Sequence, residues 1–383
     1  MTKRSRIPAL AAMLALAAPA AAVVATAGPA HAATQVRYAY VDLGVLGPPN
    51  SGPPSSRAHD INASGQIVGY SDVRGNPAVH AFRWQKGTMA DLGIHYQSPY
   101  SVSAAAAIND NGDAVGHGNV SEHEPSHALL FRDGEVRDLG TGLGDGSGSH
   151  ANDINNAGLV VGARVTGQGA PERAVIWRKG SIRELGTFGG TAGRFGTESI
   201  AYGVNEVGHV VGAALPPSGP LHAFVWNGRR LRDLGTLGGN NEATTARDIN
   251  DAGQITGYSP NADGRVHAFL RDRGVMRDLG VPTGATSSFG YGINNRGQVV
   301  GTAGFGEFLD PEAHARAVIW QDGVMTDLRT LVDDVPPDVN LLTGHAINDD
   351  GVIVGSTCIG TCYSDHRRIA GPAFMLVPKS PEA

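Results

Sequence analysis

The chain has 383 residues, with 30 Lys and Arg against 36 Asp and Glu, which gives a formal net charge of −6 when His is neutral. Nucleic acids and anionic membrane surfaces are bound by clustered positive charge, so this balance argues against both as partners. Glycine accounts for 54 residues. Because the glycines recur at fixed offsets from aliphatic residues, which disordered segments do not show, we expect a folded protein built from repeats.

Residues 1–32 have the pattern of a secretory signal peptide. Basic residues precede an Ala-rich apolar stretch, which ends at the small-x-small site Ala30-His31-Ala32. We expect cleavage after Ala32 and a secreted, extracellular protein. Pro19 and Gly28 interrupt the apolar stretch, and no later segment is apolar enough to span a bilayer, so we expect no membrane insertion after cleavage.

A skeleton of about 45 residues recurs seven times along the rest of the chain. Each copy has a small residue, an aliphatic–Asn pair, Gly three residues after the Asn, a second Gly, a His-Ala-Phe element and Asp-Leu-Gly. The pairs are Ile61-Asn62, Ile108-Asn109, Ile154-Asn155, Val204-Asn205, Ile249-Asn250, Ile293-Asn294 and Ile347-Asn348. Repeats of this length without helical periodicity are typical of propeller blades, each with four strands, A to D.

The fixed positions have structural interpretations. In Asn-x-x-Gly, the Asn side chain can bond the backbone two residues on and the Gly accepts a positive φ, so the motif predicts the turn between strands A and B. The small residue, such as Ala201, suits the crowded inner strands of a propeller. We interpret the repeated His as a hydrogen-bonding tie between strands or blades, and Asp60, Asp153 and Asp248 as groups that satisfy local backbone rather than catalyse.

The two ends of the repeat array complement each other. The seventh copy has no strand D after Phe374, whereas residues 38–44 have the strand D pattern without strands A to C before them. Pairing them would close the ring and remove two exposed edges. We therefore predict an all-β, seven-bladed β-propeller of four-stranded blades, forming a single domain over residues 33–383. The expected blades are 58–93, 105–140, 151–186, 201–235, 246–280, 290–329 and 344–378, with the closing strand at 36–44.

The repeated elements His80-Ala81-Phe82, His222-Ala223-Phe224 and His267-Ala268-Phe269 give the chain its family resemblance. The sequence resembles the HAF repeat family of extracellular, β-propeller-like repeats, and the resemblance covers about residues 36–378. Departures include Arg173 and Arg316 in place of His, Glu184 in place of Asp, and Arg329 in place of Gly. The resemblance implies a secreted protein and supplies no catalytic residues.

One loop of blade two is rich in metal-ligand types. It contains His117, Glu122, His123 and His127, and such side chains suit zinc. Their spacing matches no known motif, so they are weak candidates, and we expect neither a metal nor a cofactor.

Cys358 and Cys362 are the two cysteines of the chain. In an oxidising compartment we expect them to form a disulfide, with Gly360 giving the small ring its flexibility; metal binding and free thiols are the alternatives.

The connections between strands B and C vary in length. Between the strand B glycine and the His-Ala-Phe position there are 9 or 10 residues in blades one to five, but 14 and 16 in blades six and seven. Variable loops on a rigid scaffold often carry binding residues. On the face formed by the B–C and D–A connections, the candidate binding residues are Phe305, Glu307, Phe308, Tyr363, His366, Arg367 and Arg368.

Motifs of nucleophilic catalysis are absent from the sequence. We therefore expect a monomeric, non-enzymatic module that binds an extracellular polysaccharide or protein through the B–C/D–A face of blades six and seven. One alternative is a glycan-active hydrolase or lyase with carboxylates in the axial channel, which clustered acidic side chains of shifted pKa would favour. The other is a purely structural surface repeat.

Overall fold

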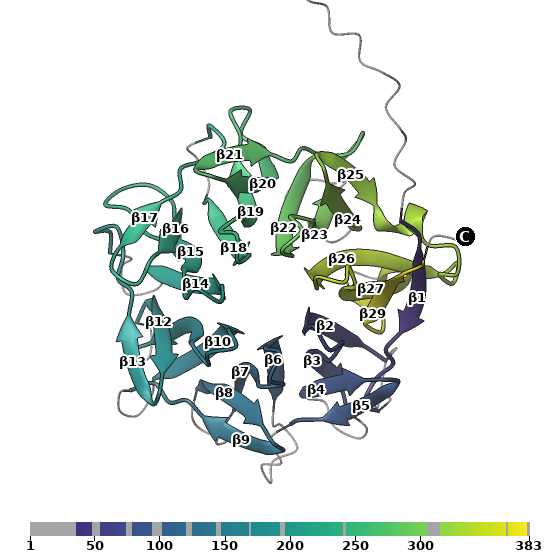
Figure 1. Cartoon of the computed structure of the whole chain (residues 1–383), viewed down its shortest axis with the longest axis horizontal. Helices are drawn as coiled ribbons and strands as arrows, with labels where there is room; N and C mark the ends of the chain where they lie inside the picture. Colours follow the sequence, from purple (N-terminus) through teal and green to yellow (C-terminus); the bar gives the residue numbers. More distant parts are fainter. Residues whose placement is uncertain are drawn as a thin grey trace, which may run out of the picture. The chain divides into compact units, whose positions relative to one another are not determined.

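The computed structural model describes residues 36–47, 54–73, 79–93, 102–119, 125–142, 147–167, 170–191, 196–239, 243–304, 315–364 and 367–380. Residues Val36–Ala383 form one compact unit. Its strands form seven antiparallel sheets that are arranged as blades in a ring (Figure 1). This is a seven-bladed β-propeller, as predicted. Among the described residues, no helix is long and apolar enough to cross a membrane.

Strand A of each blade lies nearest the axis (Figure 1). Blades one to three are β2 (Ser56–Ile61), β3 (Ile67–Asp72), β4 (Val79–Gln85) and β5 (Thr88–Asp91); β6 (Ser103–Ile108), β7 (Ala114–Asn119), β8 (Ser126–Arg132) and β9 (Glu135–Asp138); and β10 (Gly148–Ile154), β11 (Val160–Val165), β12 (Glu172–Arg178) and β13 (Ser181–Glu184). Blades four and five are β14 (Ser199–Val204), β15 (Val210–Ala214), β16 (His222–Trp226) and β17 (Leu231–Asp233); and β18 (Thr245–Ile249), β19 (Ile255–Pro260), β20 (Val266–Asp272) and β21 (Val275–Asp278). Blades six and seven are β22 (Ser287–Ile293), β23 (Val299–Gly304), β24 (Ala315–Gln321) and β25 (Val324–Asp327); and β26 (Val339–Ile347), β27 (Ile353–Ser364), β29 (Phe374–Pro378) and β1 (Tyr38–Asp42).

The closing strand is where the sequence predicts it. β1 pairs with β29 in antiparallel register from Tyr38 opposite Pro378 to Asp42 opposite Phe374, so the chain's first strand is strand D of the last blade. Tyr38 and Leu43 are buried on either side of this closure. Both strands would otherwise expose an unpaired edge.

The repeated Asn has a second role besides the turn. The Gly three residues later has a positive φ in all seven blades, as predicted. The Asn side-chain oxygen, however, accepts the N–H four residues on in every blade, and the N–H two residues on only beside Asn62 and Asn294. Its Nδ2 donates to the backbone oxygen of the next blade's Asn at 3.0–3.2 Å, and Asn348 returns to Asn62. Seven buried bonds thus form a closed ring around the axis.

Strand B needs its second Gly because the backbone of strand A approaches it closely. A Cβ on Gly212 would lie 2.0 Å from the carbonyl oxygen of Ile200, and the other six positions give 1.9–2.0 Å. Each of these A–B pairs also contains a register shift, for example between Ala201 and Gly203. One residue of strand A, here Tyr202, therefore has no partner, as in a β-bulge.

The His of the His-Ala-Phe element ties strand C to strand D. The Nδ1–H groups of His80, His127, His222 and His267 donate to Asp91, Asp138, Asp233 and Asp278, with nitrogen–oxygen distances of 2.7–2.9 Å. In blades three and six, where Arg replaces the His, Arg173 pairs with Glu184 and Arg316 with Asp327, both at 3.5 Å, whereas blade seven has Pro372 at this position. The predicted role of the His is confirmed, and the Arg departures preserve the same ion pair. The apolar core lies between neighbouring blades, where clusters draw residues from both.

Blades six and seven differ from the others as their sequences do. Where Arg329 replaces the usual Gly, the chain forms a short 3₁₀ helix, η1 (Leu328–Leu331), capped by Asp327. The long connection of blade seven is not a simple loop, because β28 (Arg367–Ala370) folds back on the extended β27. Cys358 and Cys362 form the expected disulfide there, and Gly360 between them has a φ of 68°.

Candidate functional site

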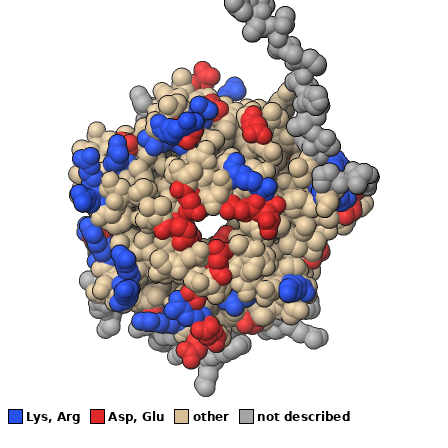
Figure 2. Space-filling model, in the orientation of Figure 1, with Lys and Arg blue, Asp and Glu red and all other residues tan. Residues whose placement is uncertain are grey.

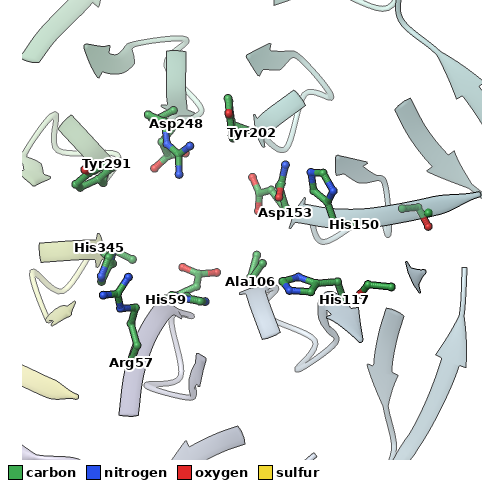
Figure 3. A pocket seen from close by; sticks show the side chains of 18 of the residues that line it. Arg57, His59, Ala106, His117, His150, Asp153, Tyr202, Asp248, Tyr291 and His345 are labelled. Carbon is green, nitrogen blue, oxygen red and sulfur yellow. The ribbon is translucent and has the colours of Figure 1, made fainter. Parts of the chain in front are cut away.

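The axis of the ring contains a pocket of about 660 Å³. It is lined mainly by residues of the A strands. It extends to the side of the B–C and D–A connections, where Gly148 begins β10, Val165 ends β11 and Ser126 begins β8. The unpaired bulge residue of every A strand reaches it, because a bulge turns its side chain out of the sheet. We call these seven the bulge residues: His59, Ala106, Asn152, Tyr202, Arg247, Tyr291 and His345. Figure 3 shows several of them converging from different blades.

Aromatic rings and one guanidinium occupy the part of the wall formed by blades four to seven. The Arg247 guanidinium carbon lies 4.1 Å from the centre of the Tyr202 ring and 5.7 Å from that of Tyr291, so two rings of neighbouring blades flank the cation. Tyr291 in turn stacks on Phe289, with 6.5 Å between ring centres, and lies 5.9 Å from His345. The rings hold one another in place without blocking the pocket.

The imidazoles of the pocket are neutral at neutral pH. Burial lowers the pKa of His59 to about 4, although its bond to the carbonyl oxygen of Ala105 opposes the shift. Burial and the neighbouring His59 hold the pKa of His345 well below its usual value. Burial also lowers the pKa values of His117 and His150. Neutral imidazole can both donate and accept a hydrogen bond.

The remaining charge of the wall comes from two guanidinium groups and three carboxyl groups. The described cations that line the pocket are Arg57 and Arg247, and the carboxyl groups belong to Asp60, Asp153 and Asp248. Among the described residues, no carboxylate forms an ion pair with Arg247. A guanidinium held between two rings at a pocket wall is therefore a ready partner for an anion.

The three carboxyl groups connect blades. Asp60 accepts the N–H groups of Ile61 in its own blade and Ile108 in the next, and Asp153 and Asp248 make the equivalent two bonds. They satisfy backbone, as predicted, and also join blade one to two, three to four and five to six. Burial raises the pKa of Asp60 to about 7 against the effect of these bonds. Burial and the other two carboxyl groups raise the pKa of Asp153 well above its usual value, and burial raises that of Asp248.

The opposite mouth of the channel is acidic. It is formed by the A–B turns and lined by Asp110, Glu206, Asp251 and Asp349, and Figure 2 shows Asp and Glu gathered around the central opening. Each of these carboxylates accepts a backbone N–H of the preceding blade. No group of three potential metal ligands occurs within the described ranges.

Most of the binding residues expected from the loops cannot be placed. Phe305, Glu307, Phe308 and His366 lie outside the described residues. The backbones of Tyr363, Arg367 and Arg368 belong to the β27–β28 hairpin, whose side chains are not described. This patch therefore stays a prediction.

Two of the four weak metal candidates of blade two lie outside the described residues, and the other two have different surroundings. Glu122 and His123 lie outside the described residues. His127 is bonded to Asp138, whereas His117 lines the axial pocket.

The bulge residues are what sequence reasoning missed. Three residues before each repeated Asn, between the constant small residue and the constant aliphatic–Asn pair, the repeat carries His, Ala, Asn, Tyr, Arg, Tyr and His in turn. Variation at one position inside a constant repeat is a signal that the side chain there does not serve the fold. The register shift that aims this position at the axis cannot be read from the pattern.

No protein-family model matches the chain, and no curated protein matches it either. Among solved structures it is similar to a puromycin-hydrolyzing peptidase of Mycobacterium tuberculosis, with a TM-score of 0.51 and 13% identity over 84% of this chain. The chain spans 52% of the peptidase's length. It is also similar to YCF48 bound to D1 peptide (TM-score 0.48, 11% identity, 91% of this chain and 97% of that one). A third similar structure is SapL1 lectin in complex with alpha methyl fucoside (TM-score 0.37, 12% identity, 74% of this chain and 97% of that one). The similarity to the peptidase shows the propeller fold alone.

Proposed function

We propose that the protein is an extracellular binding module that takes part of a polysaccharide into its axial pocket. The supporting observation is that seven bulges aim side chains of five kinds at one pocket, whereas the turn and close-approach positions of the repeat keep the same residue in every blade. Concave sites with a few convergent polar groups and rings are typical ligand sites. Neutral imidazoles and tyrosine hydroxyls suit a ligand rich in hydroxyl groups, because both donate and accept hydrogen bonds. The pocket lies on the B–C/D–A side of the propeller, the face that the sequence predicts to bind, but at the axis of the ring rather than in the loops of blades six and seven.

An enzyme is the second candidate, and one observation favours it. The pKa of Asp60 is raised to about 7 in a pocket that also contains neutral imidazoles, and shifted carboxyl groups of this kind serve as general acids or bases. We rank binding first because both oxygens of Asp60 already accept backbone N–H groups. The carboxyl group is thus used to join two blades rather than to contact a substrate.

The test is to fill the pocket without disturbing the ring. Ala106 is a bulge residue, and other blades carry Tyr, Arg or His at the same position, so Ala106→Trp should fold normally. The matched control is Val207→Trp, which adds the same ring at an exposed A–B turn. On an array of extracellular polysaccharides, binding should be lost in the Ala106 variant and kept in the control. Polysaccharide binding that survives in both would place the site elsewhere, and turnover of a bound glycan would favour the enzyme.

Secretion and membership of the HAF repeat family are further proposals, supported by residues 1–32 and by the repeated His-Ala-Phe elements. N-terminal sequencing of the protein from the culture medium should begin at Ala33. Retention of residues 1–32 on the exported protein would contradict the cleavage site.

A further inference from the structure

We infer that the axial pocket recognises a carboxylate, so that its ligand is an acidic polysaccharide containing uronic acid units, with Arg247 as the residue that contacts the carboxylate. This inference rests on the proposed function and names its ligand class.

The geometry around Arg247 carries the inference. Its guanidinium lies between Tyr202 and Tyr291 of the two neighbouring blades, and it also hydrogen-bonds the Tyr202 hydroxyl. A guanidinium has five N–H donors, so contacts with the two rings and one bond to a hydroxyl leave donors at its edge for a ligand. That edge matches the two oxygens of a carboxylate. In the part of the chain that the structure describes, no carboxylate occupies this place.

The carboxyl groups of the wall do not exclude an anionic ligand. Asp60, Asp153 and Asp248 each have one backbone N–H donated to each oxygen, so their charge is already compensated by dipoles of two blades. Burial raises the pKa of Asp60 to about 7, which further reduces its negative charge at neutral pH. Arg57 adds a second guanidinium to the pocket from blade one (Figure 3). The carboxyl groups of the wall are therefore partly compensated, and Arg247 supplies a fixed positive charge beside them.

The rest of the wall favours a sugar over a peptide. The neutral imidazoles and the hydroxyls of Tyr202 and Tyr291 both donate and accept, which suits sugar hydroxyls. The aliphatic residues of the wall, such as Ala106 and Ala346, are small. A volume of about 660 Å³ falls in the range of small-ligand sites and suits a few sugar units of a chain rather than a folded partner.

The experiment measures affinity by calorimetry for tetrasaccharides of galacturonic acid, mannuronic acid and hyaluronan, each compared with its carboxyl-reduced form. The secreted protein is tested as wild type, Arg247→Met, Arg247→Lys and Ala106→Trp. Arg229→Met is the matched control, because it removes the same charge at an exposed position outside the pocket. Thermal unfolding of each variant establishes that it folds.

For at least one acid, we expect reduction of the carboxyl groups to weaken wild-type binding at least tenfold. Arg247→Met should weaken binding of the acid similarly but that of the reduced sugar little, and Arg247→Lys should restore part of the loss. The carboxylate inference would be overturned if the wild type bound the reduced and the acidic sugars equally and Arg247→Met changed neither affinity. If Ala106→Trp then blocked binding of both sugars, the proposed function would still stand. Failure of every saccharide, or binding that Ala106→Trp leaves intact, would overturn both. An acidic peptide that binds the pocket when no saccharide does would also overturn both.

Discussion

Replacing Gly355 by Ala should destabilise the closing blade severely. An ideal Cβ there would lie 1.9 Å from the carbonyl oxygen of Thr343 and 2.8 Å from two ring carbons of Phe374. Neither neighbour can move freely, because Thr343 belongs to the paired strand β26 and Phe374 is fully buried. Strand A would have to shift by about 1 Å, and such overpacking costs about 3 kcal/mol or more.

Gly344→Ala in the same blade is the matched control. The nearest atom to its Cβ would be Val300 Cβ at 3.2 Å, and five other blades carry Ala at this repeat position, so we expect a cost below about 1 kcal/mol. Thermal and urea unfolding followed by Trp fluorescence measure both. At roughly 2 °C per kcal/mol for a domain of this size, Gly355→Ala should lower Tm by about 6 °C. Equal Tm values for the two variants would refute the close approach as the reason for the glycine.

Four further predictions concern the ring and the pocket. Asn205→Asp removes the Nδ2 donor of the buried ring and should cost about 2–4 kcal/mol, whereas Asn227→Asp at an exposed turn should cost almost nothing in the same unfolding assay. His222→Arg should be nearly neutral because Arg occurs at this position in two blades, while His222→Ala should lose about 1 kcal/mol; equal losses would contradict the strand tie. Deletion of residues 36–47 exposes an edge of β29 and should cause aggregation on size-exclusion chromatography, and a truncated monomer as stable as the parent would disprove the closure. Galacturonate tetramers keep their carboxylates ionised between pH 6 and 8 and should bind about two- to tenfold more tightly at pH 6 than at pH 8, because protonation of Asp60, with its pKa of about 7, removes negative charge from the pocket; unchanged affinity would contradict this.

The blades and their closure could be predicted because the residues that specify them act locally. Asn-x-x-Gly defines a turn within six residues, and the missing strand D at one end has its counterpart at the other. The ring of asparagine bonds could not be predicted, because each Nδ2 finds its acceptor in the next repeat, 44–54 residues away along six of the seven bonds. It explains why the residue is Asn and never Asp: a carboxylate has no proton to donate.

The pocket was harder to predict than the fold. The length of the connections predicts binding residues in blades six and seven, where the connections between strands B and C are longest. Alternation along a strand would aim neighbouring residues at opposite faces, but a bulge breaks that alternation. Tyr202 follows the buried Ala201 and precedes Gly203, and only the register shift between these two shows that it lies unpaired at the axis.

The same bulge separates stability from recognition. The asparagine ring, the close-approach glycines and the strand C–D ties all use other positions of the repeat. Among the bulge residues, His59 and Asn152 bond a carbonyl oxygen of the next blade, but the remaining ties between blades do not depend on this position. Ala106 and Arg247 occupy equivalent positions in the same closed ring although one is small and the other is a long cation. The scaffold therefore tolerates different side chains at its axis without repacking. In the proposed binding function, the ligand would be selected by these seven positions, and the contact between Arg247, Tyr202 and Tyr291 is where three of them act together.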